Sequence, residues 1–226
     1  MATHPLDNVI WSALTTRQPH LAIGDDRARR YAADMAPFVA VPDAGADAAR
    51  AVAGLATPGE VLTMVGVTPE DLAGWTVERR SAVSQMVYDR AGPPGLEGGE
   101  VEVLGPGDAA EMLDLMAEVY PGYFRPRTAE MGLYLGVREE GRLVAMAGQR
   151  MALDGWREIS AVATRPGHRG RGLAGRLVAR LTAEILREGL APFLHVDADN
   201  LAARAAYEKA GFALRRDLPL LRIRRD

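Results

Sequence analysis

The stretch TRPGHRGRGLAGRL, residues 164–177, places glycines and arginines between two apolar patterns. Before it runs EISAVAT (158–164), which is typical of a buried strand, and after it comes LAGRLVARLTAEIL (173–186), which has the period of an amphipathic helix. Glycine lets a backbone approach a ligand closely, and the first turn of a helix offers unpaired N–H groups at a positive dipole end. A strand, a glycine loop and a helix in this order therefore predict a site for a phosphate-bearing ligand.

Glycine-rich stretches also occur as dinucleotide-binding loops, Walker A loops and disordered arginine–glycine segments. We do not expect a dinucleotide loop, which needs the spacing G-x-G-x-x-G early in a βαβ unit. A Walker A loop requires a G-K-[ST] ending that this loop lacks. A nucleic-acid-binding RGG segment would repeat and would not continue into an amphipathic helix. A loop that only turns the chain is the alternative that these residues alone leave open.

Composition limits the kinds of site that the chain can hold. Its 226 residues suffice for one large domain or two small ones, and the net charge of −3 gives no overall attraction to nucleic acid or to an acidic membrane. Without cysteine the chain has no disulfide, thiolate metal site, iron–sulfur cluster or cysteine nucleophile. We expect no metal site, because the histidines are far apart in the sequence: His4, His20, His168 and His195. No basic, apolar leader occurs and no apolar run of about 18 residues, which predicts a cytoplasmic protein.

A segment rich in proline and glycine, DRAGPPGLEGGE (89–100), divides the chain. We predict a first domain over residues 1–90, a linker over 91–99 and a second domain over 100–226. The first domain should contain helices at 7–15 and 47–56, strands at 20–24, 36–41 and 60–67, and a strand pair across 75–88. The second should contain a strand at 101–104, a helix that starts at Asp108, a hairpin around 139–141, strands at 158–164 and 192–196, helices at 173–188 and 201–210, and a final strand pair.

The two halves resemble each other in sequence. GWTVERRSAVSQMV (74–87) aligns with GFALRRDLPLLRI (211–223), both beginning with glycine, an aromatic, a small and an aliphatic residue and then charges. HLAIGDD (20–26) likewise aligns with YLGVREE (134–140). These matches predict an internal repeat whose first half lacks the glycine loop, although two hairpins at sheet edges can also look alike by chance.

Two motifs of the second half resemble those of the GNAT superfamily of N-acetyltransferases. From Arg169 the loop reads R-x-x-G-x-A, similar to the acetyl-CoA signature Q/R-x-x-G-x-G/A, and HVDADNLAARAAYEKAGFALRR (195–216) resembles the second motif of the superfamily. The resemblance covers residues 100–226. It implies an α/β (α+β) fold with a mixed, splayed central sheet flanked by helices, which separates between parallel strands at 158–164 and 192–196. The first half would be a degenerate GNAT-like domain, an arrangement that resembles the glycine N-acyltransferase-like branch.

The resemblance also implies which residues bind acetyl-CoA, the expected co-substrate. The pantetheine arm would pair with backbone groups in the split of the sheet, and the pyrophosphate would lie on N–H groups of the glycine loop. The oxyanion that forms during transfer would be bound by backbone N–H near Val162. The implied cofactor-binding residues are Val162, Ala163, Thr164, Arg169, Gly170, Arg171, Gly172, Leu173, Ala174 and Asn200.

Acyl transfer to an amine requires a neutral amine, a stabilised oxyanion and a proton for the leaving thiolate. Glu158 stands where members of the superfamily often carry the general base, acting directly or through water. Strand alternation would give one face these four side chains: Glu158, Ser160, Val162 and Thr164. An ordinary ion pair at the strand end, with Arg157 for example, is the alternative for Glu158.

Tyr207 follows Asn200 by seven residues, so both side chains should project from one face of a helix. By resemblance, Tyr207 would act as the general acid that protonates the CoA thiolate, and Asn200 would bond to the cofactor. A core tyrosine and an N-cap asparagine are the alternatives.

Two further features stay open at this stage. His195 is either a residue that faces the acceptor or an interior histidine with satisfied hydrogen bonds. The segment YPGYFRPRTAEMGLYLG (120–136) either closes over the acceptor, with its arginines holding a carboxylate, or is a surface loop.

The expected function is that of an acetyl-CoA-dependent N-acetyltransferase acting on the amine of a small or amino-acid-like acceptor. The alternatives are a non-catalytic acyl-CoA-binding sensor and an N-acyltransferase that uses a longer acyl-CoA. We expect no nucleic-acid partner, no membrane partner, and a monomer or homodimer.

Overall fold

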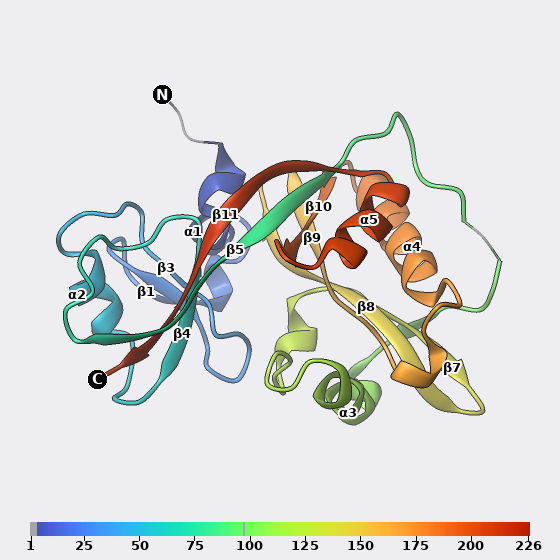
Figure 1. Ribbon diagram of the computed structural model, residues 1–226, viewed down its shortest axis with the longest axis horizontal. Coiled ribbons are helices and arrows are strands. Elements are labelled where there is room, and N and C mark those ends of the chain that lie inside the picture. Colours follow the sequence, from blue (N-terminus) through green and yellow to red (C-terminus); the bar gives the residue numbers. More distant parts are fainter. Residues whose placement is uncertain (1–3, 97) are drawn as a thin grey trace.

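A mixed eight-stranded sheet runs through the whole molecule, in the order β4-β11-β5-β10-β9-β8-β7-β6 (Figure 1). The computed structural model describes residues 4–96 and 98–226. The strands of this sheet are β4 (Val61–Val65), β5 (Trp75–Tyr88), β6 (Glu102–Leu104), β7 (Tyr134–Glu139), β8 (Arg142–Leu153), β9 (Trp156–Thr164), β10 (Ala191–Asp197) and β11 (Phe212–Arg225). A separate three-stranded sheet contains β1 (Ala22–Gly24), β2 (Arg29–Tyr31) and β3 (Val39–Ala40). The observed architecture is the predicted mixed sheet flanked by helices.

The helices cover both faces of the sheet. They are α1 (Val9–Thr15), α2 (Ala48–Ala53), α3 (Ala109–Val119), α4 (Leu173–Arg187) and α5 (Leu201–Lys209). The apolar stripe of α4, spaced at the helical period, packs against β8 and β9 through Leu177, Leu181 and Ile185. On the opposite face, Met112 and Leu115 of α3 contact the same two strands. The strand that leads into the glycine loop is therefore buried between two layers of helix.

The predicted strand pairs at 75–88 and at the C-terminus are wrong, because each segment is a single 14-residue strand. In the structure β5 and β11 pair with each other antiparallel along their length, from Phe212 opposite Tyr88 to Arg225 opposite Trp75. Their charged residues lie on an exposed stretch of a hydrogen-bonded ladder, interrupted only by two shifts of register.

The order of elements supports the internal repeat. The succession β1-β2-β3-α2-β4-β5 corresponds to β7-β8-β9-α4-β10-β11, and Phe38 beside β3 pairs in parallel with Thr63 of β4, just as β9 pairs in parallel with β10. Both long strands follow a glycine with positive φ, Gly74 before β5 and Gly211 before β11. The division into residues 1–90, 91–99 and 100–226 stays a prediction, and β5 lies between β10 and β11 in the same sheet.

The sheet splits between β9 and β10. Their parallel pairing runs from Trp156 opposite Ala191 to Ile159 opposite Leu194 and then stops, although β9 continues to Thr164. Beyond that point β9 pairs only with β8. The splay expected between these two strands is therefore present.

A bulge in β9 overturns the predicted alternation of its side chains. Ala161 has φ of 52°, a conformation that non-glycine residues rarely adopt, and the register with β8 shifts beside it. Ala161 and Ala163 pack with the cluster of α3, whereas Ile159 and Val162 pack with that of α4. Val162 therefore does not share a face with Glu158 and Ser160. Strained backbone of this kind is concentrated at functional sites.

Candidate active site

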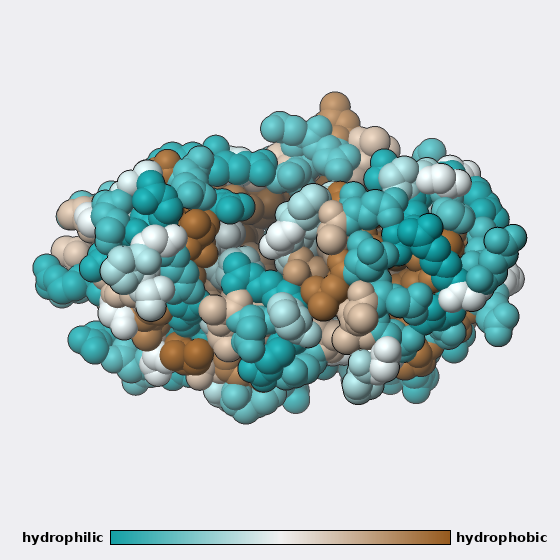
Figure 2. Space-filling view, turned by 90° about the horizontal axis from the view of Figure 1, so that it is seen from below, coloured by the Kyte–Doolittle hydropathy of each residue, from teal (hydrophilic) through white to brown (hydrophobic). Residues whose placement is uncertain are grey.

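A cleft of about 410 Å³ opens where β9 and β10 diverge, and both halves of the chain line it. Figure 2 shows this face hollowed between the two halves, with hydrophobic side chains visible inside a hydrophilic rim. The first half contributes Val9, Pro37, Phe38, Thr63, Val65, Arg79 and Val83. The second half contributes Tyr120 to Tyr123, Arg150, Met151, Ile159 to Val162, His195 to Asp197, Asn200, Ala203, Tyr207, Leu220 and Arg222.

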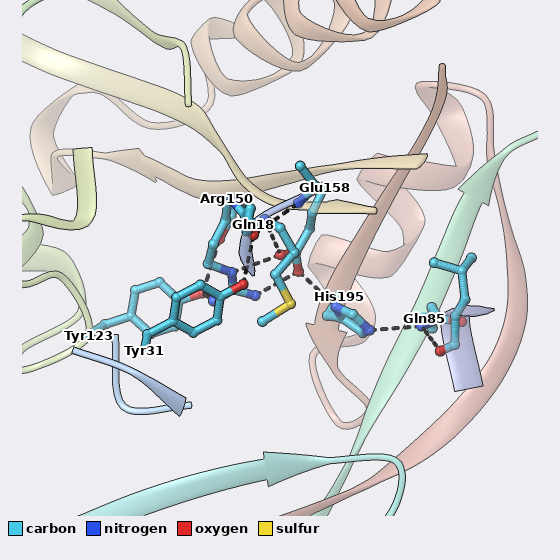
Figure 3. A network of polar contacts seen from close by, with 11 residues as sticks. Gln18, Tyr31, Gln85, Tyr123, Arg150, Glu158 and His195 are labelled. Atoms are coloured by element: carbon cyan, nitrogen blue, oxygen red, sulfur yellow. Dashed lines mark hydrogen bonds and ion pairs between the residues drawn. The ribbon is translucent and has the colours of Figure 1, made fainter. Parts of the chain in front are cut away.

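Glu158 lies behind the cleft wall, fully buried between Arg150 and His195 (Figure 3). Arg150 of β8 donates two hydrogen bonds to its oxygens, with Nε–Oε2 at 2.8 Å and Nη2–Oε1 at 2.6 Å. His195 Nδ1 lies 2.8 Å from Oε1, and the Met151 N–H lies 3.3 Å from Oε2. Burial alone would raise the pKa of Glu158, but the charge and hydrogen bonds of Arg150, helped by His195, lower it to about 2.

These surroundings do not favour Glu158 as a direct proton acceptor. Both carboxylate oxygens are occupied, the side chain has no exposed surface, and a carboxylate with so low a pKa is a weak base at neutral pH. Glu158 does form an ion pair, but with Arg150 on the neighbouring strand and not with Arg157. A role in which Glu158 acts through another group or through water remains compatible with the geometry.

The network continues from His195 into the first half of the chain. Gln85 of β5 accepts a bond from Arg215 at its Oε1 atom, so its amide N–H groups are left to donate to the Leu6 carbonyl and to His195 Nε2, at 2.9 and 3.0 Å. His195 then carries its proton on Nδ1, toward Glu158. His195 both lines the cleft and has satisfied ring nitrogens, so both sequence interpretations apply in part.

The opposite wall of the cleft comes from the segment at 120–136. The Tyr123 oxygen accepts a bond from Arg150 Nη1 at 2.5 Å and lies 3.2 Å from Ser160 Oγ. The arginines of the segment lie elsewhere: Arg125 donates to the Ala33 carbonyl, and Arg127 binds Glu130. Tyr120 to Tyr123 of the segment line the cleft and Arg125 and Arg127 do not, and closure of the segment over the acceptor stays a prediction.

Tyr207 and Asn200 of the second predicted motif both line the cleft. Tyr207 packs edge-on against Phe212, with 6.3 Å between ring centres. Burial, together with the nearby Tyr120 and Tyr123, raises the pKa of Tyr207, so its hydroxyl keeps its proton at neutral pH. The Asn200 side chain accepts the Ala203 N–H at 3.0 Å, so the capping role is observed and contact with a ligand stays a prediction.

The glycine loop has the geometry of an anion site. Gly170 and Gly172 have φ of 75° and 76°, and a Cβ at either would meet no atom within 4 Å. Conformation and access, not crowding, therefore require glycine at both positions. In the described part of the chain no side chain caps the N-terminus of α4 after Gly172, and the buried Thr164 Oγ1 atom at the end of β9 has no hydrogen-bond partner. These unsatisfied groups fit the pyrophosphate and pantetheine of coenzyme A.

The two predicted arginines of the loop already have partners in the chain. Arg169 Nε donates to the Thr164 carbonyl at 3.2 Å, and Arg171 forms an ion pair with Glu139 at 2.7 Å. Both keep further N–H donors, because a guanidinium has five.

The loop also has the spacing of the dinucleotide fingerprint G-x-G-x-x-G, at Gly170, Gly172 and Gly175. Spacing alone therefore does not exclude a dinucleotide site, but the sheet does. A dinucleotide-binding unit needs a parallel, doubly wound sheet, whereas β9 has an antiparallel neighbour in β8 and only β10 beside it in parallel.

Several residues of the cleft were not predicted from the sequence. Arg150, Gln85, Arg79 and Arg222 come from strands that were expected to be hairpin arms or edge strands. The pair Gln149-Arg150 within the apolar run LVAMAGQRM is the one local signal, since polar residues in a buried strand require partners.

A mixed sheet split between two parallel strands, with a glycine loop opening the helix after the first of them, defines the GNAT class of fold. The FR47-like family model matches residues 134–218. A protein assigned to the GNAT family of acetyltransferases from Novosphingobium aromaticivorans has a solved structure that is similar over 99% of this chain and 100% of that one, with a TM-score of 0.91 and 32% identity. The chain belongs to the GNAT family.

Two further solved structures share the fold at lower identity. They are a GCN5-related N-acetyltransferase from Kribbella flavida (TM-score 0.61, 16% identity, 97% of this chain and 94% of that one) and a GCN5-related N-acetyltransferase-like protein from Streptococcus suis (TM-score 0.61, 18% identity, 96% and 92%). No curated protein matches the sequence. Within residues 4–96 and 98–226, no helix has the length and apolar character needed to cross a membrane.

Proposed function

We propose that the protein is an acetyl-CoA-dependent N-acetyltransferase that acts on the amine of a small or amino-acid-like acceptor. The observation that carries this proposal is the position of Tyr207. Tyr207, whose hydroxyl keeps its proton, lines the same cleft into which the split between β9 and β10 opens, and a module that only bound acyl-CoA would not need this proton donor.

Acetyl-CoA supplies the acetyl group as a thioester. The N–H groups from Arg169 to Ala174 hold the pyrophosphate at the start of α4, where the dipole of the helix favours an anion. The backbone of Val162, Ala163 and Thr164 lies beyond the last pairing with β10 and has groups available for the pantetheine arm, with Thr164 Oγ1 as a further partner. Asn200 closes the site from the N-cap position of α5.

In the reaction the amine nitrogen forms a bond to the acetyl carbonyl carbon and the carbon–sulfur bond breaks. Tyr207 donates its hydroxyl proton to the departing sulfur, and backbone N–H near Val162 stabilises the negative charge on the carbonyl oxygen. The proton of the amine leaves through water at the cleft wall. Glu158 assists by holding Arg150 and His195 in place, and Arg150 in turn fixes Tyr123.

The repeated order of elements supports a placement near the glycine N-acyltransferase-like branch, with residues 1–90 as the degenerate half, 91–99 as the linker and 100–226 as the catalytic half. We further propose a cytoplasmic protein that is a monomer or homodimer.

A thiol-release screen tests the function. Acetyl-, propionyl- and longer acyl-CoA are each offered with a library of small amines, and free CoA is measured. We expect amine-dependent release that is fastest with acetyl-CoA. Tight binding of acetyl-CoA without release for any amine would identify a sensor module instead, and a preference for a longer chain would change the acyl group of the proposal.

A further inference from the structure

Two arginines on the floor of the cleft lie directly opposite each other. Arg79 of β5 and Arg222 of β11 are register partners in the antiparallel ladder, and Thr63 of β4 is the partner of Arg222 on its other side. All three residues line the cleft. Like charges at directly opposed positions destabilise a sheet, so an anion that lay between the two guanidinium groups would relieve their repulsion.

Most hydrogen-bond donors of this pair are available. Arg79 forms a single bond, to Asp197 at 3.3 Å, and Arg222 forms a single bond through Nε, to Glu78 at 3.0 Å. Each guanidinium has five N–H groups, so among the described residues most of them have no acceptor. Both arginines are about half exposed, and ion pairs at such positions are weak. A carboxylate could therefore compete for them.

The other arginine of the cleft is already committed. Arg150 is buried, and it donates hydrogen bonds from Nε and Nη2 to Glu158 and from Nη1 to Tyr123. Arg79 and Arg222 are thus the only cations lining the described cleft that can offer a paired fork of donors to a ligand.

An apolar surface separates this basic pair from the split in the sheet. Leu220 and Val65 are register partners, two residues from Arg222 and Thr63 on the same face of the sheet. Val83 and Phe38 add further apolar side chains to the cleft lining. Val83 pairs with Asp197 at the end of β10 and stands four residues from Arg79, a distance of roughly 13 Å along an extended strand. An arginine side chain covers part of that distance, which leaves room for a small acceptor.

We propose that Arg79 and Arg222 bind a carboxylate of the acceptor, so that the substrate class is an amine that carries both a carboxylate and an apolar body. This inference rests on the proposed acetyltransferase function and assigns its acceptor subsite to the floor built from β4, β5 and β11. The carboxylate lies on the arginine pair, the apolar body lies on Leu220 and Val65, and the amine points to the split.

The test compares L-leucine and L-phenylalanine with their carboxamides as acceptors for acetyl-CoA. The variants are Arg79→Met and Arg222→Met, with Arg224→Met as matched control, because Arg224 also pairs with Glu78 but does not line the cleft. We expect each cleft variant to raise KM for the two carboxylates by about 10- to 100-fold, as for loss of a charge-assisted hydrogen bond, and to change KM for the carboxamides little. Comparing each variant with wild type on the same acceptor cancels the different basicities of the amines.

Calorimetric titration of L-leucine in the presence of CoA supplies a readout that needs no turnover. If both cleft variants weaken transfer to carboxylates and to carboxamides equally, or weaken neither, the carboxylate site is refuted. The proposed acetyltransferase function would then still stand. Leucine binding that depends on Arg222 without transfer to any amine would support the site and refute the transferase. If no amine is acetylated and leucine binding does not depend on Arg222, both the carboxylate site and the transferase function are refuted.

Discussion

At the scale of single residues, a change at Tyr207 distinguishes an acetyltransferase from a module that only binds acyl-CoA. We expect Tyr207→Phe to lower kcat and leave the Kd for acetyl-CoA unchanged, because the ring still packs against Phe212 and only the proton donor is lost. General acids contribute about 10²–10⁴-fold, and a thiol with a pKa of about 8.5 leaves readily enough to place the effect at the low end. Steady-state kinetics with a titration of acetyl-CoA measures both quantities.

Tyr88→Phe is the matched control for this variant. Tyr88 packs on the same Phe212 ring, at 5.5 Å, and its hydroxyl donates to the Gly92 carbonyl away from the cleft. It should keep full kcat. Full kcat in the Tyr207 variant as well would make Tyr207 a packing residue.

Gly172 carries the anion site of the loop. Gly172→Glu should abolish binding of acetyl-CoA, because the new carboxylate would occupy the place of the pyrophosphate and repel it. Part of any effect on stability comes from the positive φ of 76°. Gly189→Glu at the other end of α4 has the same backbone strain, with φ of 74° and open space around the Cβ position, and should bind acetyl-CoA normally. Acetyl-CoA affinity within a few-fold of wild type in Gly172→Glu would refute the assignment of the loop.

At the scale of elements, the buried pair of Arg150 and Glu158 joins β8 to β9. Glu158→Gln should destabilise the protein by about 3–5 kcal/mol, because it leaves a buried cation without its partner. The double variant Arg150→Met with Glu158→Met should recover part of that loss, since two apolar side chains leave no buried charge. Urea unfolding of the three proteins at pH 7 measures the differences. A double variant less stable than Glu158→Gln would show that the pair is required as a unit.

The same pair makes stability depend on pH in a defined direction. The pKa of Glu158 is lowered from 4.5 to about 2 in the folded protein, so its contribution is complete above pH 4.5 and is lost as the pH falls toward 2. The difference in unfolding free energy between wild type and the double variant should therefore shrink across that interval. A difference that stays constant from pH 5 to pH 2 would contradict the assigned ionisation.

The part of the site that could be predicted from the sequence is the part whose residues lie close together in the chain. The glycine loop, Asn200 and Tyr207 lie in local motifs, where the helix start and the helical period determine position. Arg150 meets Glu158 only because β8 and β9 form a hairpin with shifted register, and Gln85 reaches His195 only because β5 inserts beside β10. No local pattern encodes the register shift of the first pair, and the second pair joins strands that are far apart in the sequence.

At the scale of the whole molecule, the two halves form one sheet. The fold class and the split were predictable, because two motifs resemble those of the GNAT superfamily and that resemblance implies both. The misassigned strands were β5 and β11, whose central charges look like turns but lie on the exposed part of a ladder between the halves. That ladder also supplies the arginine pair on the cleft floor. The proposed acceptor site therefore lies on β5 and β11, the two strands that the sequence predicted least well.

The shared sheet makes a specific prediction about fragments. Residues 100–226 contain the glycine loop and both GNAT-like motifs, but β5 normally fills the position between β10 and β11. Without it, β10 loses the partner that spans Phe193 to Asp197, and the cores against β11 are exposed to water. We expect the fragment 100–226 alone to be aggregated or unfolded, judged by near-UV circular dichroism and size-exclusion chromatography.

Co-expression with the complementary fragment, residues 1–96, is the matched control. The break then lies in the segment at 89–100, outside the sheet, and β5 can pair with β10 and β11 as in the intact chain. The two fragments should co-purify as one particle that binds acetyl-CoA with the affinity of the whole protein. A fragment 100–226 that unfolds cooperatively and binds acetyl-CoA by itself would show that the second half is an independent domain, and that β5 only adds a wall to the cleft.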